Sequence, residues 1–86
     1  MITYDGGTGE TREDAVTILG AANSQEGIKA EYDFLSQKLG APGQDWDMVR
    51  QSLLQHDGRY FDEIVVLIRR DRSQRSYFFD ITDFFG

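Results

Sequence analysis

The sequence predicts an α+β domain in which one main helix packs on an antiparallel sheet of three to five strands. Three observations lead to this prediction. Apolar residues recur at the helical period between residues 24 and 39, Asp57-Gly58 has the composition of a hairpin turn, and β-branched and aromatic runs follow that turn. The expected element order is strand, strand, helix, strand, strand, strand. A chain of 86 residues suits one domain, so we expect a single α+β domain over residues 1–86.

The first two strands are expected on either side of a glycine-rich segment. Met1 to Tyr4 predicts a short strand, and Gly6-Gly7-Thr8-Gly9 ends it because glycine adopts backbone conformations that other residues avoid. Ala15 to Leu19 is apolar and β-branched, which predicts the second strand, and Gly20 closes it. The N-terminal residues lack the basic and apolar regions of a signal peptide, so none is expected.

The helix is predicted from residue 24 to residue 39. Asn23 or Ser24 can cap its N-terminus, and Glu26 follows Asn23 by three residues, as in a capping box. Gly40 favours the left-handed conformation that ends a helix, and Pro42 prevents continuation. Four residues at helical spacing predict one buried stripe, namely Ile28, Tyr32, Leu35 and Leu39.

Two consecutive hairpins are predicted after the helix. Asp57-Gly58 should pair His56 with Arg59, and the same register pairs Val49 with Val66. The first strand of this meander is expected from Trp46 to Gln55. Trp46, Val49 and Leu53 also fit a helix, so the sequence leaves strand and helix open for this segment.

The second hairpin is expected to turn at Asp71–Gln74, between strands at Tyr60–Arg70 and Arg75–Ile81. This register sets three apolar cross-strand pairs, which are the units that stabilise a sheet. The pairs are Ile68 with Tyr77, Val66 with Phe79, and Ile64 with Ile81.

Strand alternation divides the apolar residues of the meander between two faces. The face that the helix should cover consists of Val49, Leu53, Ile64, Val66, Ile68, Tyr77, Phe79 and Ile81. The opposite face is expected to carry Trp46, Met48, Leu54, Phe61, Val65, Leu67 and Phe78, with Arg50, Glu63 and Asp80 among them. A helix and a sheet form only two layers, so this opposite face needs a cover. The cover is the C-terminal Asp83-Phe84-Phe85 segment, the N-terminal strand region or another molecule, and in the last case the face is an interface.

A basic cluster is predicted at the tip of the second hairpin. It consists of Arg69, Arg70, Arg72 and Arg75, which we call the arginine tip. Guanidinium groups bind carboxylates and phosphates, so the tip could grip an acidic protein surface or a phosphate. The alternative is a solvated tip whose charges discourage edge-to-edge pairing of strands.

Composition narrows the function classes. There are no cysteines, which excludes disulfides and thiolate sites, and we therefore expect a cytoplasmic protein. The net charge of −6 argues against nucleic acid as the main partner, because phosphates are repelled. The longest apolar run, Ile64 to Ile68, is far too short to cross a membrane.

No residue is predicted to be catalytic, to bind a cofactor or to ligate a metal. His56 is the only histidine and precedes a turn, so it cannot build a histidine metal site. One alternative is a small metal-dependent or carboxylate-based hydrolase that uses Asp62, Glu63 and Asp80. Another is a weak nucleic-acid adaptor that binds through the arginine tip.

The C-terminal string from Tyr77 to Gly86, YFFDITDFFG, resembles the ending of small uncharacterised bacterial proteins. Ala30-Glu31-Tyr32, Asp45-Trp46 and Gln51-Ser52-Leu53 extend the similarity. The resemblance implies a compact bacterial α+β domain and carries no activity, substrate or site.

The leading hypothesis for function is a non-enzymatic protein-interaction module. It would bind a partner, in the manner of an inhibitor or immunity protein, or form a homodimer. Aromatic and arginine residues are the usual anchors of an interface. The interface candidates are accordingly Trp46, Phe61, Phe78, Arg69, Arg70, Arg72 and Arg75.

Overall fold

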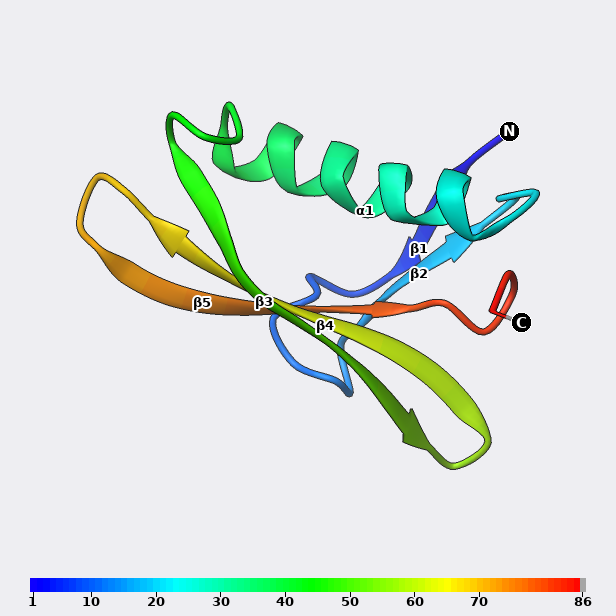
Figure 1. Cartoon of the computed structure of the whole chain (residues 1–86). Coiled ribbons are helices and arrows are strands. Elements are labelled where there is room, and N and C mark those ends of the chain that lie inside the picture. The colour runs from blue at the N-terminus through cyan, green and yellow to red at the C-terminus, as the bar shows by residue number, and fades with distance from the viewer. Residues whose placement is uncertain (86) are drawn as a thin grey trace.

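A computed structural model describes residues 1–85, and the last residue of the expected domain, Gly86, lies outside the described part. The elements follow the predicted order, and the α+β class is confirmed (Figure 1). They are β1 (Thr3–Gly6), β2 (Val16–Leu19), α1 (Ser24–Leu39), β3 (Trp46–His56), β4 (Arg59–Ile68) and β5 (Ser73–Asp80).

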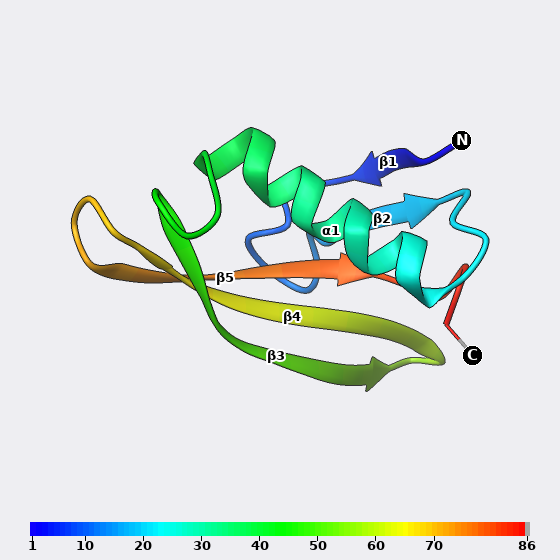
Figure 2. The ribbon, with the colours of Figure 1, turned by 45° about the horizontal axis from the view of Figure 1, so that its top comes forward.

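The five strands form one sheet in the order β1-β2-β5-β4-β3, and α1 lies on one face of it (Figures 1 and 2). The prediction of a purely antiparallel sheet is wrong at one pair, since β2 and β5 run parallel. The hairpin from β4 makes β5 antiparallel to β4, and β5 then enters the sheet beside β2 in the same direction as β2. Turn signals specify only neighbouring strands, so this long-range pairing left no local signature.

The helix begins and ends where the sequence predicts. The Asn23 side chain accepts a hydrogen bond from the Glu26 amide at 3.0 Å, and the Glu26 carboxylate accepts one from the Ala22 amide. Gly40 ends the helix with a φ of 106°.

The buried face of α1 is rotated from the predicted stripe. Leu35 is fully buried, but Ile28 is 39 % exposed, so the prediction is wrong there. The helix runs along β2 and β5 and not over the second half of β3 (Figure 2), and this position selects the buried face. The buried residues of α1 are Gly27, Ala30, Glu31 and Leu35.

The segment from Trp46 to His56 is a strand, so the helical alternative is wrong. His56 pairs with Arg59 as predicted, but Val49 does not pair with Val66. Met48 pairs with Val66 and Arg50 with Val65, so a β-bulge leaves Val49 without an opposite residue. Residues before the bulge therefore lie on the other face from the one that simple alternation predicts.

The β4–β5 hairpin differs from its predicted register by four residues. Ile64 pairs with Tyr77 and Ile68 with Ser73, so the turn is Arg69–Arg72. Arg72 has a φ of 61°, and Asp71 accepts hydrogen bonds from the amide and hydroxyl of Ser73, which hold this earlier turn. A shift of four keeps every side chain on its face, so the predicted set on β4 and β5 is still the core. That core consists of Val16, Ile18, Ala30, Leu35, Trp46, Ile64, Val66, Ile68, Tyr77, Phe79 and Ile81.

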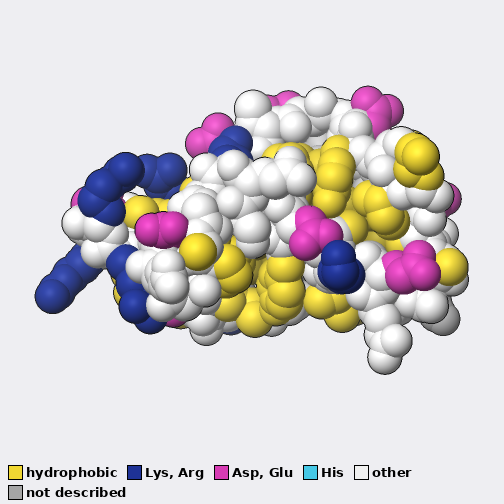
Figure 3. Space-filling model, turned by 90° about the horizontal axis from the view of Figure 1, so that it is seen from above, with side chains coloured by type: hydrophobic (Ala, Val, Ile, Leu, Met, Phe, Trp, Pro, Cys, Tyr) yellow, Lys and Arg dark blue, Asp and Glu magenta, His cyan; other side chains and the backbone are white. Residues whose placement is uncertain are grey.

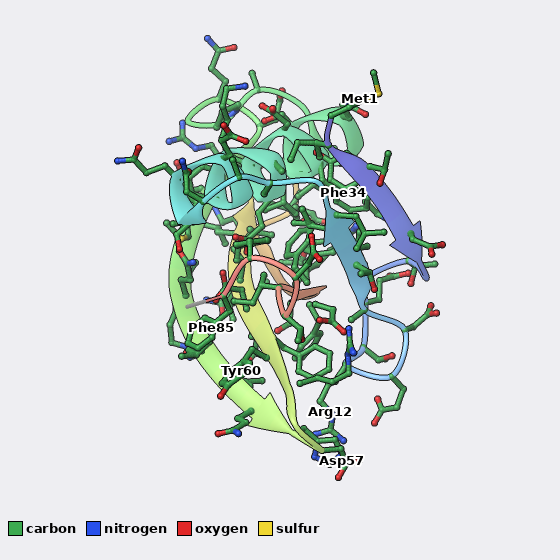
Figure 4. All side chains as sticks on the ribbon, turned by 90° about the vertical axis from the view of Figure 1, so that its right-hand side faces the viewer. Met1, Arg12, Phe34, Asp57, Tyr60 and Phe85 are labelled. Atoms are coloured by element: carbon green, nitrogen blue, oxygen red, sulfur yellow. The ribbon has the colours of Figure 1, made fainter. Side chains whose placement is uncertain are left out.

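The C-terminal segment packs on the helix side of the sheet. A Cβ added at Gly27 would lie 2.1 Å from the Phe84 ring, so the two are in close contact. Phe85 stacks on Tyr60 with ring centroids 4.1 Å apart (Figure 4). The segment therefore does not cover the opposite face of the sheet, as one alternative expected.

Candidate interaction surface

The edge of the sheet formed by β3 is free. β3 has 11 residues and pairs with β4. On its other side Pro42 forms a single bridge to Trp46, and among residues 1–85 no further strand pairs with that side. Three large apolar side chains on it are exposed: Met48 at 43 %, Val49 at 49 % and Leu53 at 54 %. The prediction that α1 covers Val49 and Leu53 is wrong, since both side chains are exposed.

A groove runs between α1 and β3. Tyr32 reaches from α1 to Met48, with 3.6 Å between Oη and Sδ, and two hollows lie along the groove. The upper hollow, of about 250 Å³, is lined by Tyr32, Pro42, Gly43, Trp46, Asp47 and Met48. The lower hollow, of about 200 Å³, is lined by Ser24, Ile28, Gln51, Leu53, Asp62, Ile81, Phe84 and Phe85. Together these residues define the α1–β3 groove.

Two carboxyl groups lie beneath this groove. Glu31 on α1 is fully buried, and Asp62 on β4 is 7 % exposed and reaches the lower hollow. Asp62 accepts a hydrogen bond from the Gln51 side chain at 3.2 Å. Within residues 1–85, neither carboxylate oxygen of Glu31 has a hydrogen-bond donor.

Glu31 is the member of this pair whose pKa is raised. Burial, and then the hydrogen bond with Asp62 and its charge, raise the pKa of Glu31 to about 10. Protonated Glu31 can donate to Asp62, which is the partner that the ionised form lacks. Burial and these two carboxyls also raise the pKa of Tyr32. The groove therefore has two carboxyl groups beneath it, and Glu31 is protonated at neutral pH.

The face of the sheet opposite α1 carries five of the predicted apolar residues. They are Leu54, Phe61, Val65, Leu67 and Phe78. Phe61 and Val65 are buried, whereas Leu54, Leu67 and Phe78 are half-buried. The segment between β1 and β2 lies at one end of this face, where Arg12 comes close to Asp57 (Figure 4). Phe61 is buried and lines a hollow of about 660 Å³ with residues of this segment, so this face exposes less apolar surface than expected.

Trp46 and Met48 lie on the helix side of the sheet, so the prediction that they lie on the opposite face is wrong. Trp46 precedes the bulge at Val49, and only 2 % of it is exposed. Its indole N–H donates to the Gly40 carbonyl oxygen at 2.9 Å. Trp46 is therefore a core residue that ties the helix end to β3.

The arginine tip lies at one end of the molecule (Figure 3). Arg69 forms a bidentate ion pair with Asp47, with contacts of 2.6 and 2.9 Å, and its hydrogen bond lowers the pKa of Asp47. Arg70, Arg72 and Arg75 form no ion pair within residues 1–85. A hollow of about 390 Å³ beside them is also lined by Lys38 and Asp45. The tip remains a candidate through its three unpaired arginines.

The carboxylates of the hydrolase alternative do not converge. Asp62 points toward α1, whereas its neighbour Glu63 and Asp80 point to the other face. Asp80 pairs with Arg59 at 2.6 Å; burial raises its pKa, but the bonds from Arg59 and Thr82 lower it overall. In the described part of the chain, no group of three His, Cys, Asp or Glu residues could hold a metal ion.

Sequence reasoning missed Glu31. Its position one turn before the buried Leu35 was a signal that it faces the core. The exposed edge was also missed, because alternation assigns a face and does not show where the helix lies.

Fold and surface together define a small α+β domain with a free edge strand and an adjacent groove. The chain matches no model of a protein family, and comparisons with curated proteins and with solved structures also give no match. The resemblance of its C-terminal string to small bacterial proteins stays a prediction. No helix among residues 1–85 is long and apolar enough to cross a membrane.

Proposed function

We propose that this domain is a non-enzymatic protein-interaction module that binds an extended segment of a partner protein along β3. The observation that carries the proposal is the free edge of β3 with Met48, Val49 and Leu53 exposed on it. An added strand gains main-chain hydrogen bonds from such an edge, and pockets beside the edge select its alternate side chains.

The edge has little protection against pairing. Natural edge strands are usually blunted by lysine, proline or inward-pointing charges. From Met48 to His56 the strand contains one arginine, Arg50, and neither lysine nor proline. The bulge at Val49 disturbs the first part of the edge, so Gln51–Gln55 is the segment that best accepts a new strand.

The charge of the chain favours a basic partner. A net charge of −6 raises the encounter rate with cationic proteins and lowers it with acidic ones. The bacterial origin and cytoplasmic location expected from the sequence stay predictions. The proposal moves the interface from Trp46, Phe61 and Phe78 to the β3 edge, and leaves the arginine tip as a second contact.

The test is selection of binding peptides from a random display library, followed by mapping of the bound peptide by NMR. We expect the amide signals of Gln51–Gln55 to shift and to gain protection from hydrogen exchange. Leu53→Glu should weaken binding by about tenfold or more, as at an interface anchor. Leu19→Glu is the matched control, because Leu19 is an exposed leucine on another strand. Failure to select peptides, or peptides that leave the β3 amides unchanged, would overturn the proposal.

Self-association is measured first, by light scattering of the wild-type chain and of Leu53→Glu. A monomer in both leaves a different protein as the partner. A dimer that Leu53→Glu dissociates identifies the partner as a second copy of this chain. A dimer that persists in Leu53→Glu places self-association elsewhere and contradicts the role of β3 in it.

A further inference from the structure

We infer that the lower hollow of the α1–β3 groove is a site for a lysine or arginine side chain of the partner, with Asp62 as its anion. The inference rests on the proposed function, since it names the side chain that an added strand would place there. Successive side chains of a strand point to opposite faces of the sheet. A residue of the added strand that lies beside Gln51 and Leu53, on the same face as they do, would therefore point toward this hollow.

The carboxyl groups beneath the groove have more hydrogen-bond acceptors than donors around them. Glu31 and Asp62 bring four carboxyl oxygens together. One oxygen of Asp62 accepts a hydrogen bond from the Gln51 side-chain amide, and the two oxygens of Glu31 have no partner among the described residues. Buried polar groups are satisfied in nearly all proteins, and an unpaired buried carboxylate is costly. An ammonium group supplies three N–H donors and a guanidinium group five, so either would satisfy the oxygens of Asp62 that the hollow exposes.

The walls of the hollow suit the rest of such a side chain. Ile28, Leu53 and Phe85 are apolar and more than one-third exposed, and Asp62 lies between them at the floor. Lysine and arginine bury their methylene stems on apolar surface while the charged end reaches a polar group. A neutral apolar side chain would fill the walls and leave Asp62 unpaired, and an acidic one would be repelled.

Glu31 lies behind Asp62 and becomes a second negative charge when a cation binds. The titratable groups that act on Glu31 are Asp62 from β4 and Tyr32 from α1, and the Gln51 amide from β3 donates to Asp62. Without a bound cation Glu31 holds a proton, because burial and Asp62 raise its pKa. A cation at Asp62 stabilises the ionised form of Glu31, so the proton leaves to solvent when the cation binds. Glu31 is therefore a positioning residue, and binding is expected to strengthen as pH rises.

The experiment uses N-acetyl-arginine-amide as the probe and N-acetyl-norleucine-amide as its neutral counterpart, both titrated into the wild-type chain and observed by NMR. The arginine probe is expected to shift signals of Gln51, Leu53 and Asp62, and the norleucine probe is not. Asp62→Asn should weaken the arginine probe by about tenfold, the loss typical of a hydrogen bond to a charged group. Glu63→Gln is the matched control, because Glu63 is the next residue of β4 and points to the other face.

Proton release separates the role of Glu31 from a structural one. Calorimetry in buffers of different ionisation enthalpy should show release of a proton by the wild-type chain, and none by Glu31→Gln. Equal shifts from both probes, or an Asp62→Asn variant that binds the arginine probe as well as wild type, would overturn the inference.

Its failure is distinguishable from failure of the proposed function. Selected peptides that pair with β3 but place no basic residue beside Asp62 overturn the cation site and keep the interaction module. An arginine probe bound at Asp62, with no peptide paired to β3, keeps the cation site and overturns strand addition.

Discussion

β3 and β5 are both antiparallel neighbours of β4, and they differ in how they use their apolar residues. On β5, Tyr77 and Phe79 are fully buried, whereas Met48 and Leu53 on β3 are about half exposed. The two strands share β4 as a partner, but β5 also pairs with β2, whereas β3 is the edge of the sheet. In addition, α1 packs on β2 and on β5, through Phe34 against Phe79, and leaves most of β3 open (Figure 2).

The side of the molecule at β5 therefore buries its apolar residues, and the side at β3 leaves them exposed. Burial of apolar surface stabilises a domain, and an exposed apolar edge contributes little to stability and marks an interface. Glu31 and Asp62 lie at the boundary between the two sides, under the open groove.

The largest expected effect is on the covered strand. Phe79→Ala should lower the free energy of unfolding by about 3–5 kcal/mol, because it removes a ring that also packs edge-on against Phe34 at 5.5 Å. Leu53→Ala on the open strand should lower it by less than about 1 kcal/mol. Urea unfolding of both variants measures the difference. Similar losses for the two would show that β3 is covered in solution.

The next effect in size belongs to Glu31 and depends on pH. Its pKa is about 4.5 in the unfolded chain and about 10 in the folded one, so between these values the folded chain holds one more proton. Stability from this group is complete below the lower value and is lost as pH rises toward the higher one. The free energy of unfolding should therefore fall by about 1.4 kcal/mol per pH unit from about pH 5 to pH 8.

Glu31→Gln tests this slope. The variant has no proton to take up, so the slope should disappear, and at pH 7 it should be more stable than wild type by about 2–3 kcal/mol. Urea unfolding across the pH range gives both values. Carboxylates with lowered pKa values, such as Asp80, stay ionised in this window and add no slope. A slope that persists in Glu31→Gln would contradict a protonated Glu31.

The smallest expected effect is at the end of the groove. Gly27→Ala would push a methyl group into the Phe84 ring, which should cost about 1–2 kcal/mol after the gain in helix propensity. In a Phe84→Ala background the clash is absent, so Gly27→Ala should then be neutral or stabilising. Thermal unfolding of the single and double variants measures this coupling. Additive effects would show that Phe84 does not pack on α1.

Much of the fold could be predicted because its signals are local. Asn23, Glu26 and Gly40 mark the ends of α1, and Asp57-Gly58 marks the first hairpin, since caps and turns depend on residues a few positions apart. The second turn was misplaced, yet Tyr77 and Phe79 were assigned to the core, because an even shift in register preserves the face.

The candidate site could be predicted only in part. Leu53 was expected under the helix and lies on that face of the sheet but is exposed, whereas Trp46 was expected on the open face and lies on the helix side. One bulge residue, Val49, moves Trp46 to the other face, and the sequence has no glycine or proline there to indicate it. Glu31 was not predicted at all, because a glutamate on a helix is usually solvated.

The amino-acid sequence by itself determined the order of the elements, the bounds of the helix and the apolar set of β4 and β5, because these follow from periodicity and local turn chemistry. Only the tertiary structure decided that β5 lies between β2 and β4, that α1 covers β5 and not the second half of β3, and that Glu31 meets Asp62. These are contacts between segments far apart in the chain, and the free energy that selects them is the burial of the whole core, which no local pattern records.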